Sequence, residues 1–175
     1  GNPYFIWGKK ILLDSAGEWF LEPGASSAGQ LYLWTPNGDN PNNHTVEVKR
    51  RTYAFDLTDR SFIRVEGFQI FAAMIITGNP EDPDASLSSN IILKNIHVRY
   101  PSHFTFVTPG TAWQKGMTDS GLILFGKNHQ LLDSSVAFSA GNGVTLAGSN
   151  HRITNTIIHD IDYTATDTSA VTTGL

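Results

Sequence analysis

Short apolar runs separated by turn-forming residues follow one another along almost the whole chain. The runs are rich in Val, Ile, Leu and Phe, and clusters of Gly, Pro, Asn, Ser and Thr divide them. No window of about 11 residues or more has apolar residues at the helical spacings of three and four. Short strands bounded by turn residues are typical of β-structure, so the pattern predicts an all-β protein.

One pattern is repeated without a gap. The segment GLILFGKNHQLLDSSVAF begins at Gly121, and GVTLAGSNHRITNTIIHD begins at Gly143, at an offset of 22 residues (143 − 121). A looser core of the same unit (apolar, any, Asn/Asp/Gly, any, any, apolar) recurs upstream at 65–70 and 93–98. A constant core with insertions of variable length indicates a solenoid, in which each unit stacks on the next.

The Asn/Asp/Gly position of the unit predicts a bend. Gly, Asn and Asp tolerate a left-handed backbone, so two short strands can meet there at an angle. If units stack at the spacing of β-pairing, roughly 4.8 Å, Asn95, Asp133 and Asn155 lie one above another. We therefore expect their side chains to form a hydrogen-bonded ladder and residues 121–142 to superpose on 143–164.

The repeats resemble the right-handed parallel β-helix of pectate-lyase-like proteins. The segments that carry the resemblance are SFIRVEGFQI, NIILKNIHV, NHQLLDSSVAF and NHRITNTIIHD, and it covers about residues 52–175. The resemblance implies a β-helix of about four coils, which we expect to continue beyond residue 175, so that the chain is a fragment.

The N-terminal part, residues 1–51, has a different pattern. Alternating apolar residues predict an antiparallel hairpin between 19–21 and 31–34, and a further strand from Thr45 to Lys49. The domain prediction is therefore a β-hairpin region over 1–51 and parallel β-helix coils over 52–175.

Composition removes several classes of function. The chain has 175 residues, 16% charged residues and a net charge of −4, with no block of Lys or Arg that would indicate nucleic-acid or acidic-membrane binding. It has no cysteine, which excludes disulfides, Cys-based zinc sites and thiol catalysis. No apolar run approaches the roughly 20 residues of a membrane span.

Two long connections hold most of the chemically useful side chains. The first runs from Arg99 to Ser120 and the second from His159 to Ala170, and the resemblance implies that both lie at the rim of one substrate groove. Aromatic rings in the first can stack on sugar rings, or they can simply pack the loop against the coils. The candidate substrate-binding residues are His103, Phe104, Phe106, Trp113, Lys115 and Tyr163.

Acidic residues concentrate in the second connection, and Asp119 in the first and Asp167 in the second each stand just before a predicted groove strand. Glycoside hydrolysis needs two carboxyl groups about 5–9.5 Å apart, which neighbouring coils can supply. The alternative is that the carboxylates cap turns through backbone hydrogen bonds. The candidate catalytic residues are Asp119, Asp160, Asp162 and Asp167, with His159 as a local modulator.

Metal binding stays open at this point. Clustered carboxylates also suit Ca²⁺, although the EF-hand pattern is not met, so Ca²⁺ is a candidate cofactor with no assigned ligands. His129 and His151 occupy the same position of consecutive units. They are either stacked turn residues or a metal-binding pair, and the repeat favours the former.

Three functions follow, with a polysaccharide or oligosaccharide as partner in each. The first is a glycoside hydrolase with Asp acid/base catalysis. The second is a polysaccharide lyase that acts on a uronate polymer with Ca²⁺, for which Lys115 and Lys127 are the nearby candidate bases. The third is a non-catalytic carbohydrate-binding or adhesive protein. The resemblance also implies a bacterial protein that is secreted, periplasmic or at the cell surface.

Overall fold

The protein is described by a computed structural model that covers residues 8–22, 24, 29–103, 120–163 and 168–173. The chain divides into two compact units, Gly1–Val48 and Lys49–Leu175. Secondary structure is almost entirely β, with a small antiparallel pair in the first unit and parallel sheets in the second. The prediction of an all-β protein is therefore confirmed.

The first unit contains one antiparallel hairpin in its described part. Strands β1 (Trp19–Glu22) and β2 (Gln30–Leu33) pair with Trp19 opposite Leu33 and Leu21 opposite Leu31, as the alternation predicts. Two short 3₁₀ helices, η1 (Lys10–Leu12) and η2 (Pro41–Asn43), flank the hairpin.

The predicted strand from Thr45 to Lys49 is wrong. Residues 45–50 have no regular secondary structure, and Val48 is 70% exposed. The segment alternates apolar and polar residues, but in the described part of the chain no strand pairs with it. The next strand begins later, at Tyr53.

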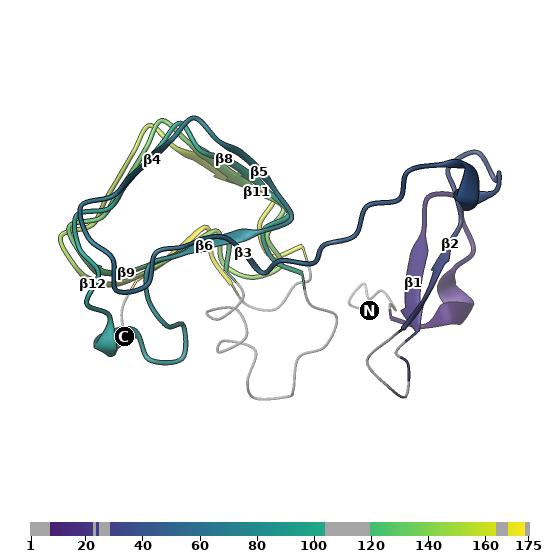
Figure 1. Cartoon of the computed structure of the whole chain (residues 1–175), viewed down its shortest axis with the longest axis horizontal. Helices are drawn as coiled ribbons and strands as arrows, with labels where there is room; N and C mark the ends of the chain where they lie inside the picture. Colours follow the sequence, from purple (N-terminus) through teal and green to yellow (C-terminus); the bar gives the residue numbers. More distant parts are fainter. Residues whose placement is uncertain (1–7, 23, 25–28, 104–119, 164–167, 174–175) are drawn as a thin grey trace, which may run out of the picture. The chain divides into compact units, whose positions relative to one another are not determined.

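In the second unit the chain visits three parallel sheets in the same order during every round. The first sheet has the strand order β15-β12-β9-β6-β3, the second β13-β10-β7-β4 and the third β14-β11-β8-β5. Figure 1 shows the rounds stacked on one another along three sides of a common interior. The strands of the first sheet are β3 (Tyr53–Asp56), β6 (Met74–Ile76), β9 (Leu122–Lys127), β12 (Val144–Ser149) and β15 (Val171–Thr173). Those of the second are β4 (Arg64–Glu66), β7 (Ile92–Lys94), β10 (Gln130–Leu132) and β13 (Arg152–Thr154). Those of the third are β5 (Gln69–Phe71), β8 (His97–Arg99), β11 (Ser135–Ala137) and β14 (Ile157–His159).

The 22-residue repeat is confirmed as two stacked rounds. In the first sheet Leu122 pairs with Val144, in the second Leu131 pairs with Ile153, and in the third Val136 pairs with Ile158. The register is therefore the same in all three sheets. A register shift of one residue in any sheet would turn its apolar side chains outward.

Each short strand places one apolar side chain inside. The second sheet lines up Val65, Leu93, Leu131 and Ile153, and the third lines up Ile70, Val98, Val136 and Ile158. Most of these side chains belong to one buried cluster. Because side chains alternate across a strand, the inner faces of the three sheets share this core.

The bends occur where the sequence predicts them. Gly67, Asn95, Asp133 and Asn155 all have a left-handed backbone, with φ between 48° and 79°. The Asn155 amide nitrogen donates to Asp133 Oδ1 at 2.9 Å. The Asn95 side chain instead contacts His97 Nε2 of its own round at 3.1 Å. The predicted ladder thus forms between the two residues of the 22-residue repeat and not along the whole row.

Candidate functional site

Five of the sequence-predicted site residues lie in the described part of the chain. They are His103, His159, Asp160, Asp162 and Tyr163, and they lie at or just after the ends of third-sheet strands, where the chain leaves for the first sheet. The others lie outside the described residues; these are Phe104, Phe106, Trp113, Lys115, Asp119 and Asp167. We call the five residues, together with Ser102 and Ser139, the corner cluster.

The two long connections meet through His103 and Tyr163. His103 Nδ1 lies 2.8 Å from the Tyr163 hydroxyl oxygen, and the two rings stack with centroids 6.0 Å apart. The Tyr163 hydroxyl donates its proton to the Ser102 carbonyl at 3.2 Å, so His103 Nδ1 must be the donor toward the phenol oxygen. This contact joins the second and fourth rounds across the short connection of the third.

Burial changes the ionisation of both rings. It raises the pKa of Tyr163 to about 12, with a smaller contribution from the neighbouring Tyr100. Burial, and then the positive charge of Lys49, lowers the pKa of His103. Both groups are therefore neutral near neutral pH, and their hydrogen bond joins two uncharged side chains.

Two buried serines hold the base of the corner cluster. Ser102 Oγ and Ser139 Oγ lie 3.0 Å apart, and the backbone nitrogen of Gly141 lies 3.3 Å from Ser102 Oγ. Ser139 Oγ donates to the Asn142 carbonyl at 2.8 Å, and the Ser139 carbonyl accepts from Asp162 N at 2.9 Å. The second, third and fourth rounds are thus tied together where the long connections begin.

The acidic residues of the corner cluster are exposed or half-buried, and both have a left-handed backbone. Asp160 has φ 51° and Asp162 has φ 60°. The Asp160 carboxylate lies 2.8 Å from His159 Nδ1, and Thr168 N donates to Asp162 Oδ2 at 3.5 Å. A carboxylate paired with an imidazole can take up or release a proton. Within the described ranges no three His, Asp or Glu side chains come together as a metal site.

A row of aromatic rings borders the corner cluster, and sequence reasoning missed it. Phe71 packs edge-on against Tyr100 at 5.5 Å, Tyr100 stacks on Phe138 at 4.8 Å, and Phe138 packs edge-on against His159 at 5.9 Å. The signal was present in the repeat. Tyr100, Phe138 and Asp160 each stand two residues after the inward residue of a third-sheet strand.

His129 and His151 connect successive rounds and leave no ring nitrogen for a metal. His129 Nδ1 accepts from Ile91 N at 3.2 Å while its Nε2 donates to the Phe125 carbonyl at 2.8 Å. His151 repeats the arrangement with His129 N at 3.3 Å and the Ala147 carbonyl at 2.9 Å. Burial lowers the pKa of His129, which agrees with its use as a neutral acceptor. The interpretation as stacked turn residues is confirmed.

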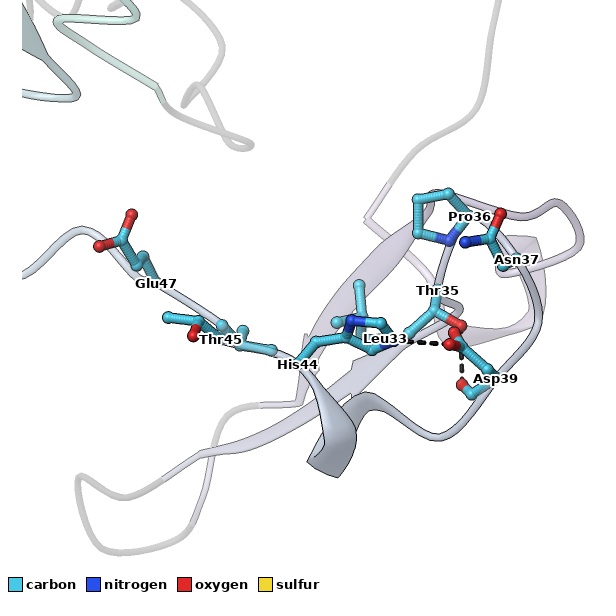
Figure 2. A pocket seen from close by; sticks show the side chains of 9 residues that line it. Leu33, Thr35, Pro36, Asn37, Asp39, His44, Thr45 and Glu47 are labelled. Atoms are coloured by element: carbon cyan, nitrogen blue, oxygen red, sulfur yellow. Dashed lines mark hydrogen bonds and ion pairs between the residues drawn. The ribbon is translucent and has the colours of Figure 1, made fainter.

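The first unit carries a separate carboxylate–imidazole pair in a shallow depression (Figure 2). Asp39 Oδ2 lies 2.6 Å from His44 Nε2, and this hydrogen bond lowers the pKa of Asp39. The Thr35 hydroxyl donates to the Asp39 carbonyl at 2.7 Å. Because that hydroxyl is already used and Thr35 is buried, the arrangement closes the loop between β2 and η2 and offers no activated nucleophile.

Lys127, a predicted candidate base, lies apart from the corner cluster. It is the last residue of β9, five residues after Leu122, so it lies about 17 Å along the strand from the end at which β9 begins, at roughly 3.3 Å per residue.

In the part of the chain that the structure describes, no helix is long and apolar enough to cross a membrane. Comparisons of the chain with protein-family models, curated proteins and solved structures find no match.

Proposed function

We propose that the second unit is a right-handed parallel β-helix of the pectate-lyase-like kind and that the protein acts on a polysaccharide. The regular order of the three sheets supports the fold, as does the common register of the 22-residue repeat. Right-handed connections between parallel strands are the strong rule in proteins, which favours the same hand here.

The contact between His103 and Tyr163 carries the functional proposal. It brings the roots of the two long connections together on a base of hydrogen-bonded serines. Polar side chains on loops that a rigid scaffold holds in place are the usual construction of a binding or catalytic site. The exposed rings beside the cluster supply apolar faces and edges for contact with sugar rings.

The reaction we propose is glycoside hydrolysis. Two carboxyl groups are required, one to protonate the leaving oxygen and one to activate water or attack the sugar. Asp160 and Asp162 are the described candidates, and the sequence adds Asp119 and Asp167. His159, held against Asp160, then modulates that carboxyl. A polymeric substrate also fits a location outside the cell or at its surface.

A panel of neutral and acidic polysaccharides, assayed for new reducing ends, tests the proposal. Asp160→Asn and Asp162→Asn keep volume and hydrogen bonding but remove the charge, so one or both should lower turnover by ~10²-fold or more. Asp133→Asn is the matched control, because Asp133 is an exposed carboxylate at the same kind of left-handed bend in the second sheet. The melting temperature of every variant should remain close to that of the wild type.

Two results would reject hydrolysis, and a third would reject the assignment of the acid and the base. Products with the ultraviolet absorbance of a new C=C bond would identify a lyase. Binding without product would identify a carbohydrate-binding or adhesive protein. If turnover survives in Asp160→Asn and Asp162→Asn, and also in Asp119→Asn and Asp167→Asn, the acid/base assignment is wrong. If these changes unfold the protein, the carboxylates serve as turn caps.

A further inference from the structure

The outer face of the third sheet contains no acidic residue in its strands, and all of its outward side chains except Ala137 are exposed or half-buried. One row along the stack consists of Phe71, Arg99, Ala137 and His159, and the row beside it of Gln69, His97, Ser135 and Ile157. Phe71 is 73% exposed and Ile157 is 67% exposed. Neighbouring positions in a row are about 4.8 Å apart, so the face places the Arg99 guanidinium within a short distance of exposed apolar groups.

Arg99 lies in the middle of this face and stacks on two aromatic rings. Its guanidinium carbon is 5.2 Å from the Phe138 ring centre and 5.8 Å from the Tyr100 ring centre. Among the described residues, no carboxylate lies within ion-pair distance of Arg99. Stacking on the rings thus orients the planar guanidinium group of Arg99, and its charge has no acidic partner among the described residues.

The second sheet shows the opposite arrangement. Arg64 Nε is 2.7 Å from Glu66 Oε2, and Lys94 Nζ is 3.7 Å from Glu66 Oε1 and 3.9 Å from Asp133 Oδ2. The charges of these four side chains neutralise one another, whereas Arg152 in β13 donates to Thr154 Oγ1 at 2.9 Å. Two exposed arginines on equivalent short strands therefore differ in one respect, which is that only Arg64 has an acidic partner among the described residues.

We propose that the outer face of the third sheet binds the acidic groups of a polysaccharide, with Arg99 as the anion-binding residue and Phe71 as a stacking surface. The guanidinium fork matches the two oxygens of a carboxylate or sulfate, and an exposed ring next to it can cover the apolar face of the sugar that carries the anion. This inference rests on the proposed action on a polysaccharide, and it assigns to that action a binding surface outside the corner cluster.

The test uses three galactose-based hexamers that differ only in charge. One is neutral, one is the galacturonate form and one is sulfated, and binding to the full chain is measured by calorimetry at low and high salt. The wild type should bind at least one charged hexamer ~10- to 100-fold more tightly than the neutral one, the scale of a charge-assisted hydrogen bond. High salt should reduce that difference.

Matched variants separate the surface from general charge effects. Arg99→Gln should abolish the preference for the charged hexamer, whereas Arg64→Gln should keep it. Phe71→Ala should weaken binding of every hexamer that the wild type holds, whereas Phe62→Ala, which removes a ring that is 82% exposed outside the third sheet, should not. Circular dichroism confirms that each variant is folded.

The inference is overturned if the wild type does not prefer a charged hexamer, or if Arg99→Gln binds it as tightly as the wild type does. In either case, polysaccharide turnover that depends on Asp160 or Asp162 would leave the proposed function standing. Conversely, Arg99-dependent binding without any turnover would refute the proposed hydrolysis and support the proposed binding surface. Preference for the galacturonate or the sulfated hexamer identifies the acidic group.

Discussion

Replacing Gly126 with alanine tests whether close contact between rounds fixes the stack. Gly126 lies in β9 with φ 120°, a conformation that side chains disfavour. A Cβ atom there would lie 2.1 Å from the Ser88 carbonyl oxygen and 3.0 Å from His129 Nε2. The same Ser88 carbonyl accepts a hydrogen bond from Lys127 N at 3.1 Å. The contact partner is backbone and cannot rotate away.

The expected cost follows from these distances. Restoring a tolerable separation of about 3 Å requires the carbonyl to move by about 1 Å, which breaks its bond from Lys127 N. Losing that bond and leaving a carbonyl poorly satisfied costs ~1–3 kcal/mol. Placing a side chain at this φ costs ~1–3 kcal/mol more. We therefore expect Gly126→Ala to lower the free energy of unfolding by about 2–6 kcal/mol.

Urea denaturation followed by circular dichroism measures the change, with Gly67→Ala as the control. Gly67 also has a positive φ, 79°, but a Cβ atom there meets nothing within 4 Å. Only the backbone cost of ~1–2 kcal/mol applies, partly offset by a stiffer unfolded chain. Equal losses in the two variants would refute the argument, because strain at positive φ alone would then explain both.

Three further predictions concern the second unit. Burial lowers the pKa of His129 below its ordinary value of 6.5, so the contribution of neutral His129 to stability is fully present above about pH 6.5 and is lost as the pH falls through the pKa of the folded state. Urea midpoints measured from about pH 8 to about pH 5 should show this loss of stability. The substitution His129→Gln should make the loss smaller. Asn155→Asp places two carboxylates where the Asn155 amide now donates to Asp133, so the melting temperature should fall by the equivalent of ~1 kcal/mol or less, and high salt should restore it. Leu131→Ala opens a cavity at a fully buried position and should cost ~2–5 kcal/mol in urea denaturation, whereas Ile157→Ala, on the exposed outer face, should change stability by no more than about 0.5 kcal/mol.

The stacking of rounds was predictable because the repeat encodes it twice. The inward positions of the second and third sheets, such as Leu131 and Val136, are always apolar, and the bends after the second sheet are always Gly, Asn or Asp. Both rules are local, so they can be found without knowing the fold. The hairpin was predictable for a related reason, since its two strands alternate in the same period.

The segment from Thr45 to Lys49 shows where local patterns fail. It alternates as a strand should, but a strand also needs a neighbour, and sequence alternation cannot tell whether one lies beside it. The aromatic row was missed because its members belong to different rounds. Phe71, Tyr100 and Phe138 are far apart in the chain and become neighbours only through the register between rounds.

The carboxylates of the corner cluster were predicted individually, but their surroundings were not. Sequence alone could not show that His159 pairs with Asp160, or that buried Ser102 and Ser139 lie under Tyr163. These contacts join different connections, and the lengths of those connections do not determine how they pack.

The shared register of the two 22-residue units has a consequence for how such a chain can change in length. Residues 121–142 present to residues 143–163 the hydrogen-bonding groups and inward side chains that a further copy of the same unit would need. A tandem duplication of this stretch of gene would therefore insert one more round, about 4.8 Å thick, without creating a mismatched junction. Deleting one copy would shorten the stack by one round, again without a mismatched junction. The number of rounds can therefore change by duplication or deletion of the gene segment while the cross-section of the stack stays the same.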